Sequence, residues 1–162
     1  MIRKLLSVVA AVMIIFPIGV LAATETTDDA RQLIVAWLKR DQRPLGEALG
    51  QSVKEVQTFK NDKGEPLYYV VYLDPSGFVI VPAEDFVEPI IAFASQGRFD
   101  PSLNNPLGAL VSGDVPARVT YARALRATEP TGHYLKAKNK WQNLQQISNG
   151  DTNGTPDRKS VV

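Results

Sequence analysis

Residues 67–81 have the sequence LYYVVYLDPSGFVIV, and this stretch decides the fold. Aromatic and β-branched residues fill positions 67–73 and 78–81, as is typical of β-strands. The intervening residues Asp74, Pro75, Ser76 and Gly77 have the composition of a tight turn, and the glycine accepts the positive φ of a bulged hairpin. The stretch therefore predicts two antiparallel strands joined by a short turn.

The segments on either side of this hairpin predict a small α+β fold. Residues 52–59 and 89–93 are rich in strand-forming residues and each predict one more strand. Upstream, Thr27 or Asp28 can cap a helix that ends before Pro44. The apolar positions of that helix share one face: Ala30, Leu33, Ile34, Trp37 and Leu38. We expect a small antiparallel sheet of three to four strands with flanking helices.

Helices are also expected after Phe99. Pro106 and Pro116 each have the character of a first helical residue, so two short helices are predicted there. A third helical stretch is expected over residues 134–144, whereas residues 148–159 have almost no apolar side chain and are expected to be disordered.

Both faces of the predicted hairpin are apolar. Alternation along the strand sets Tyr69, Val71 and Leu73 on one face and Tyr68, Val70 and Tyr72 on the other. One amphipathic helix covers only one of these faces, so the other needs a second cover, either the later helices or another protein. We take this surplus as a physical indication of a partner.

The first residues have the order of a secretory leader. Arg3 and Lys4 precede an apolar run over residues 5–16, and the segment ends in small residues at Ala22. The run is shorter than the roughly 20 residues that cross a bilayer comfortably. We expect a signal peptide over residues 1–22, cleaved near Ala22, and a secreted or periplasmic mature protein outside the membrane. An uncleaved N-terminal anchor is the alternative.

Composition excludes much chemistry. The 162 residues include 18 Lys and Arg against 17 Asp and Glu, and without Arg3 and Lys4 the balance is 16 to 17, a net charge of −1. This is a poor match for nucleic acid. There is no cysteine and a single histidine, His133, which argues against nucleophilic catalysis and the common metal sites. The pairs Asp28–Asp29 and Glu84–Asp85 are interpreted as caps. We expect no enzyme activity and no cofactor or metal.

Residues 68–73, 77–85, 89–94 and 97–99 resemble the pro-domain of streptopain-type cysteine proteases. They are equally similar to the Spi-type inhibitor, a free-standing relative of that pro-domain. The upstream helix also matches, so the resemblance spans roughly residues 25–125, and the run GFVIVPAED followed by PIIAFA is its most specific part.

The resemblance implies a domain that docks on a streptopain-type cysteine protease over its substrate cleft and keeps it inactive. The protease supplies the catalytic Cys and His, so no such residue is carried over. On this basis residues 23–127 form the inhibitor domain, and residues 128–162 form a connector-like tail with a helical start. One alternative is the pro-region of a truncated or split protease precursor, acting in folding or latency. A second is an exported carbohydrate- or surface-binding module that uses Trp37 and Trp141.

Four residues are predicted to contact the protease. They are bulky side chains on or beside the second face of the sheet and its turns, and aromatic and Arg side chains dominate binding energy at such interfaces. The predicted inhibitory contacts are Tyr68, Tyr72, Phe86 and Arg98.

Overall fold

The computed structural model describes residues 24–126, 132–148 and 150. The expected signal peptide and nearly all of the expected disordered tail lie outside these residues. The central element is the predicted hairpin, in which β2 (Pro66–Asp74) pairs with β3 (Phe78–Pro82) and Tyr72 lies opposite Phe78. Gly77 has a φ of 99°, which confirms the need for glycine in the turn, and the Asp74–Pro75 peptide bond is cis.

The hairpin is the centre of a four-stranded antiparallel sheet. β1 (Ser52–Lys60) pairs with β2, and β4 (Ala92–Ala94) pairs with β3, giving the order β1-β2-β3-β4. The last strand begins three residues later than predicted, although the Ile91 N–H already donates to the Ile80 carbonyl of β3 at 2.9 Å; Pro89 has no backbone N–H to donate. The predicted α+β class with three to four strands is confirmed.

Helix α1 (Thr27–Arg40) has its N-cap at Thr26, one residue before the first of the two predicted caps. Thr26 is the N-cap: its hydroxyl accepts the Asp29 backbone N–H at 3.2 Å, and its own N–H donates to the Asp29 carboxylate at 2.8 Å. This reciprocal arrangement is a capping box, so the cap interpretation holds for Asp29. A single 3₁₀ turn, η1 (Pro44–Gly46), follows α1.

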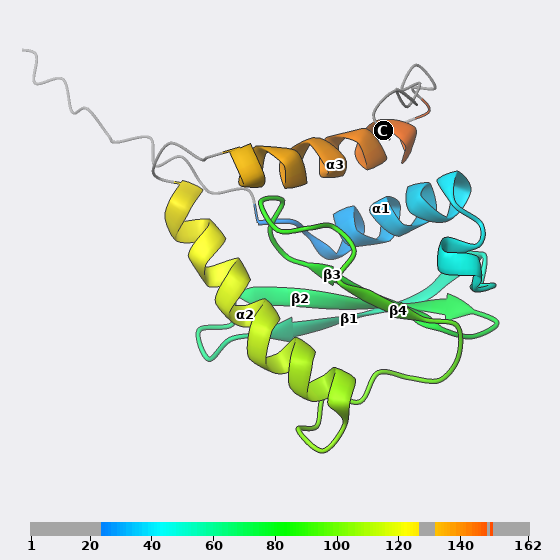
Figure 1. Ribbon diagram of the computed structural model, residues 1–162, viewed down its shortest axis with the longest axis horizontal. Coiled ribbons are helices and arrows are strands. Elements are labelled where there is room, and N and C mark those ends of the chain that lie inside the picture. The colour runs from blue at the N-terminus through cyan, green and yellow to red at the C-terminus, as the bar shows by residue number, and fades with distance from the viewer. Residues whose placement is uncertain (1–23, 127–131, 149, 151–162) are drawn as a thin grey trace, which may run out of the picture.

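Helix α1 packs on one face of the sheet, α3 (Gly132–Ser148) packs against α1 on the same side, and α2 (Pro106–Arg126) lies on the other face (Figure 1). The first core contains Leu33 and Ile34 of α1 with Tyr69 and Val71 of β2. Trp141 of α3 is fully buried there, and its indole N–H donates to the Val87 carbonyl at 2.8 Å. The core therefore extends past residue 127, the expected end of the domain.

The prediction of two short helices after Phe99 is wrong. Pro116 lies inside α2, which runs unbroken from Pro106 to Arg126. Val115 and Val119 are both buried on either side of the proline, so packing on the sheet holds the two halves in line although Pro116 donates no hydrogen bond. None of the helices in the described part of the chain is long and apolar enough to cross a membrane.

The second face of the sheet is covered by the chain itself. Val111, Val115 and Val119 of α2 pack with the outer-face residues of the hairpin, among them Tyr68 and Ile80. Of the two covers considered from the sequence, the later helices are the correct one. The apolar surplus of the hairpin is therefore used up internally and gives no reason to expect a partner.

Candidate functional site

Three of the four predicted contacts lie in the core. Tyr68, Tyr72 and Phe86 are all buried, and Tyr68 stacks on Phe59 with ring centroids 4.6 Å apart. Burial raises the pKa of Tyr68. These side chains are inaccessible because α2 and Phe99 cover the face on which they lie. In this structure the three side chains are part of the core beneath the surface and do not form the surface itself.

Arg98 is the predicted contact that lies on the surface. Its side chain is 62% exposed. Its guanidinium lies over the ring of Tyr72, 3.9 Å from the centroid, and its Nη2 is 3.3 Å from the Glu55 carboxylate of β1. These two contacts give a long side chain a defined position at the surface, so Arg98 stays a prediction for an inhibitory contact.

The loop that follows Arg98, residues 100–105, is held by its own hydrogen bonds. The Asp100 carboxylate accepts both the backbone N–H of Ser102, at 2.9 Å, and its hydroxyl, at 3.0 Å. The N–H of Asn105 donates to the Ser102 carbonyl at 3.1 Å. Phe99 is buried immediately before the loop. The 100–105 loop therefore keeps its shape although most of it is exposed.

The same loop is fastened to the start of α2. Asn105 is the cap: its side-chain oxygen accepts the Gly108 N–H at 3.0 Å, and Pro106 takes the first helical position as predicted. The Ser112 hydroxyl donates to the Pro101 carbonyl at 3.1 Å. A Cβ on Gly108 would lie 2.2 Å from the Asp100 carbonyl oxygen, so only glycine lets the loop approach this closely. The loop and the helix form one rigid unit.

This rigid unit presents apolar side chains to solvent. Leu103 in the 100–105 loop is 77% exposed, and Leu110 on α2 is 64% exposed. Exposed leucines on a backbone that is already ordered bind at a lower entropic cost than leucines on a mobile segment. The sequence reasoning missed both residues, because no local pattern distinguishes an exposed leucine from a core leucine.

A second exposed region lies at the free edge of the sheet. β4 is the last strand of the sheet, so in the described residues one of its edges pairs with no strand. A hollow of about 410 Å³ at the end of β4 is lined by Glu47, Phe93, Ala94, Ser95 and Gln96. The chain then runs directly through Arg98 into the 100–105 loop. We refer to Phe93–Gln96 as the β4-edge surface. The Arg98 side chain lies apart from it, against β2 and β1.

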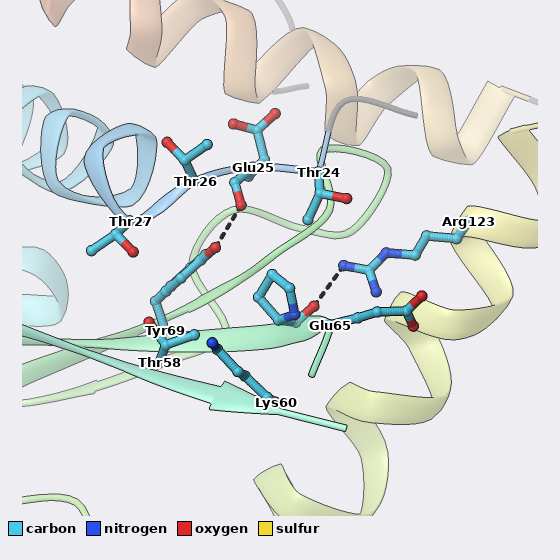
Figure 2. A pocket seen from close by; sticks show the side chains of 10 residues that line it. Thr24, Glu25, Thr26, Thr27, Thr58, Lys60, Glu65, Tyr69 and Arg123 are labelled. Atoms are coloured by element: carbon cyan, nitrogen blue, oxygen red, sulfur yellow. Dashed lines mark hydrogen bonds between the residues drawn. The ribbon is translucent and has the colours of Figure 1, made fainter. Parts of the chain in front are cut away.

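A larger polar hollow of about 510 Å³ lies at the start of α1 (Figure 2). Its polar groups engage one another: the Tyr69 hydroxyl donates to the Glu25 carbonyl at 2.6 Å, and Arg123 donates to the Pro66 carbonyl at 2.6 Å. The Glu25 carboxylate accepts from Gln145 of α3 at 3.3 Å. The hydrogen bonds of Glu25 therefore connect the residues just before α1 to β2 and α3.

Glu25 has an unusual pKa. Burial chiefly, and then the negative charges of Asp29, Asp85 and Glu84, raise the pKa of Glu25 to about 7, against the opposing effect of Arg126. A carboxyl in this state is partly protonated near neutral pH. The raised pKa makes the Glu25 carboxyl a pH-dependent contribution to stability.

The Glu84–Asp85 pair is not a cap, contrary to the prediction. Arg126 of α2 bridges the two carboxylates, and the Nε of Arg123 lies 3.7 Å from Glu84. Glu84 is fully buried, and desolvation raises its pKa despite the hydrogen bond from Arg126. Since α2 supplies both arginines, this cluster fixes the end of α2 to the loop after β3.

The remaining candidates for chemistry have structural surroundings. His133 is exposed, and its ring meets Tyr134 edge-on at 5.6 Å. Within the described ranges, no group of three His, Asp or Glu side chains is placed to hold a metal ion. Trp141 is fully buried, and Trp37 is half-buried against Phe93. Neither tryptophan offers the open stacking platform that a carbohydrate module requires.

Comparison with known protein families gives a match over more than half of the chain. The sequence model of the family described as Spi protease inhibitor matches residues 22–112. The matched region contains α1, the whole sheet, the 100–105 loop and the first residues of α2. No curated protein and no solved structure matches the chain.

Proposed function

The chain belongs to the Spi protease inhibitor family, and from that premise we propose that it is a secreted inhibitor of a streptopain-like cysteine protease. The family supports a protease as the partner and a role other than catalysis. The cysteine-protease class of the target follows from the likeness of residues 77–94 to streptopain pro-domains. Secretion follows from the leader-like residues 1–22.

The observation that carries the mechanism is the rigid 100–105 loop. A loop that blocks a substrate cleft must be exposed and must also keep its shape. Most of the loop is exposed, and its internal hydrogen bonds to Asp100 and Ser102, with the bond from Ser112 to Pro101, hold its shape. We propose that this loop, with Leu103 at its exposed part, enters the cleft and excludes substrate. Steric exclusion requires no reactive side chain of the inhibitor, in keeping with a chain that has no cysteine.

We propose that Arg98 and the β4-edge surface supply the surrounding contact area. A stable complex buries about 1,600 Å² in total, more than one loop provides. Arg98 has a defined position beside the loop and can pair with an acidic group of the enzyme. Leu103 and Leu110 would each contribute about 1.5–3 kcal/mol if fully buried on binding. These few side chains are the expected centre of the binding energy.

Enzyme inhibition tests the proposal. The mature chain, residues 23–162, is titrated into a purified streptopain-type cysteine protease, and a serine protease serves as the class control. We expect near-stoichiometric, substrate-competitive loss of activity in the cysteine protease alone. We also expect a cleft-filling covalent inhibitor to prevent complex formation. Absence of binding by calorimetry at micromolar protein would remove the proposal.

The same reagents test the pro-region alternative. The denatured protease is refolded with and without the mature chain in trans. Faster or fuller recovery of activity, without inhibition of the folded enzyme, favours a folding role over an inhibitory one.

A further inference from the structure

Leu45 combines two features that are each unfavourable for the isolated protein. Its side chain is 93% exposed, the highest value among the large apolar residues of the described chain. Its backbone has a φ of 52° and a ψ of 24°, in the left-handed region. It is the one residue other than glycine with a positive φ among the described residues.

Neither feature is explained by the fold. The left-handed region is costly for leucine because its Cβ crowds the following carbonyl, and glycine or asparagine adopts it far more readily. Burial normally offsets such a cost, but the Leu45 side chain buries almost nothing. Backbone strain that the fold does not repay is characteristic of functional positions.

The backbone around Leu45 holds this unfavourable state in place. Pro44 is buried on one side, and Gly46 follows with its own positive φ of 84°. The Gly46 N–H donates to the Arg43 carbonyl at 2.9 Å, and the Glu47 N–H donates to the Pro44 carbonyl at 3.0 Å. The side chain is thus presented from a closed 3₁₀ turn, as Leu103 is presented from the 100–105 loop.

The position of the turn links it to the surface already described. Glu47, two residues after Leu45, lines the hollow at the end of β4 together with Phe93 and Gln96. The η1 turn therefore adjoins the β4-edge surface, where the chain leaves the sheet toward Arg98 and the 100–105 loop.

We propose that Leu45 is a second anchor of the inhibitor, which inserts into an apolar pocket on the protease that accepts one branched aliphatic side chain. This inference rests on the proposed function and names a further contact of the same complex. The strain and exposure of Leu45 are then relieved in the complex, where the side chain becomes buried. The turn forms one end of the interface, and the 100–105 loop forms the other.

Two substitutions separate binding from folding at this position. Leu45→Gly and Leu45→Asn both accept a positive φ and both remove the aliphatic side chain. We expect the melting temperature of the free protein to be unchanged or to rise by about 2–4 °C. We expect the Kd for the streptopain-type protease to increase by at least about tenfold in both variants.

Leu135→Ala is the matched control, because this leucine is also exposed but lies on α3. It should leave the Kd unchanged. The inference is overturned if the Leu45 variants bind as tightly as the natural chain, or if both variants lose melting temperature, which would make Leu45 a structural residue. In either case wild-type inhibition, measured in the same series, still decides the proposed function separately.

Discussion

Gly108 lies directly against the carbonyl oxygen of Asp100, which a Cβ at residue 108 would approach to 2.2 Å. The same Cβ would lie 2.5 Å from the Ser102 carbonyl oxygen. Both neighbours are backbone atoms of the 100–105 loop, so no side-chain rotation relieves the contact. The loop can lie this close to α2 only because residue 108 has a hydrogen atom where other residues have a Cβ.

Gly108→Ala is expected to displace the 100–105 loop. Overpacking against backbone should lower the free energy of unfolding by about 1–3 kcal/mol, in spite of the better helix propensity of alanine. Because the displaced loop is the proposed cleft-blocking element, Gly108→Ala should also weaken inhibition of the protease. Gly113→Ala is the control, because that glycine lies in the same helix with nothing within 4 Å of its added Cβ. The control should gain about 0.5–1 kcal/mol. Urea denaturation and inhibition assays measure both, and equal behaviour of the two variants contradicts the prediction.

Leu103→Ala is expected to weaken inhibition without weakening the fold. The side chain is largely exposed, so its removal should change the free energy of unfolding by less than about 0.5 kcal/mol. If it is buried on binding, its loss should raise the Kd about 10- to 100-fold. Leu135→Ala again serves as control. An unchanged Kd for Leu103→Ala would mean that the 100–105 loop is not at the interface.

Glu25 is expected to make stability fall as the pH rises. The pKa of Glu25 is raised from 4.5 to about 7 in the folded state, so between these values the folded protein binds more protons than the unfolded chain. The favourable contribution is complete below about pH 4.5 and is lost as the pH rises through 7. Across this window the loss should be up to about 3 kcal/mol.

Glu25→Gln tests this because glutamine resembles the protonated acid and can still pair with Gln145. The free energy of unfolding is measured from pH 5 to pH 8 for both proteins. The advantage of the variant should grow toward pH 8 and then level off. Parallel curves would show that Glu25 titrates normally.

Arg126→Met is expected to be strongly destabilising. It leaves the fully buried Glu84 without its main cationic partner, a change that typically costs 3–5 kcal/mol. The double variant Glu84→Gln with Arg126→Met removes the stranded charge and should recover about half of the loss or more. Thermal or urea unfolding of the three proteins measures the coupling, and additive losses would argue against a linked pair.

The hairpin and α1 were predictable because local chemistry dictates them. Gly77 is required by the turn, and the alternation of β2 assigns Tyr69 and Tyr68 to opposite faces, as found. Pro116 misled the prediction because its effect depends on packing. A proline that ends an isolated helix is tolerated where Val115 and Val119 hold both halves on a sheet.

The candidate site was largely unpredictable for the same reason. Bulky aromatic residues such as Tyr72 favour interfaces and cores alike, and only the position of α2 decides which applies here. Leu45 and Leu103 carry no local signal, because the exposure of an apolar residue is a property of the whole fold. Arg98 was predictable as a surface group because an arginine is rarely buried without a partner.

The burial of Trp141 between the first and last helices has a consequence for biosynthesis. Helix α1 is made first, and the helix that packs against it, α3, begins more than 90 residues after α1 ends. Until α3 is made, the apolar side chains of α1 that contact it remain exposed and can bind a chaperone. A ribosome that stalls, or a nonsense change, before codon 132 would release a protein with its sheet complete but without the helix that brings Trp141 into the core.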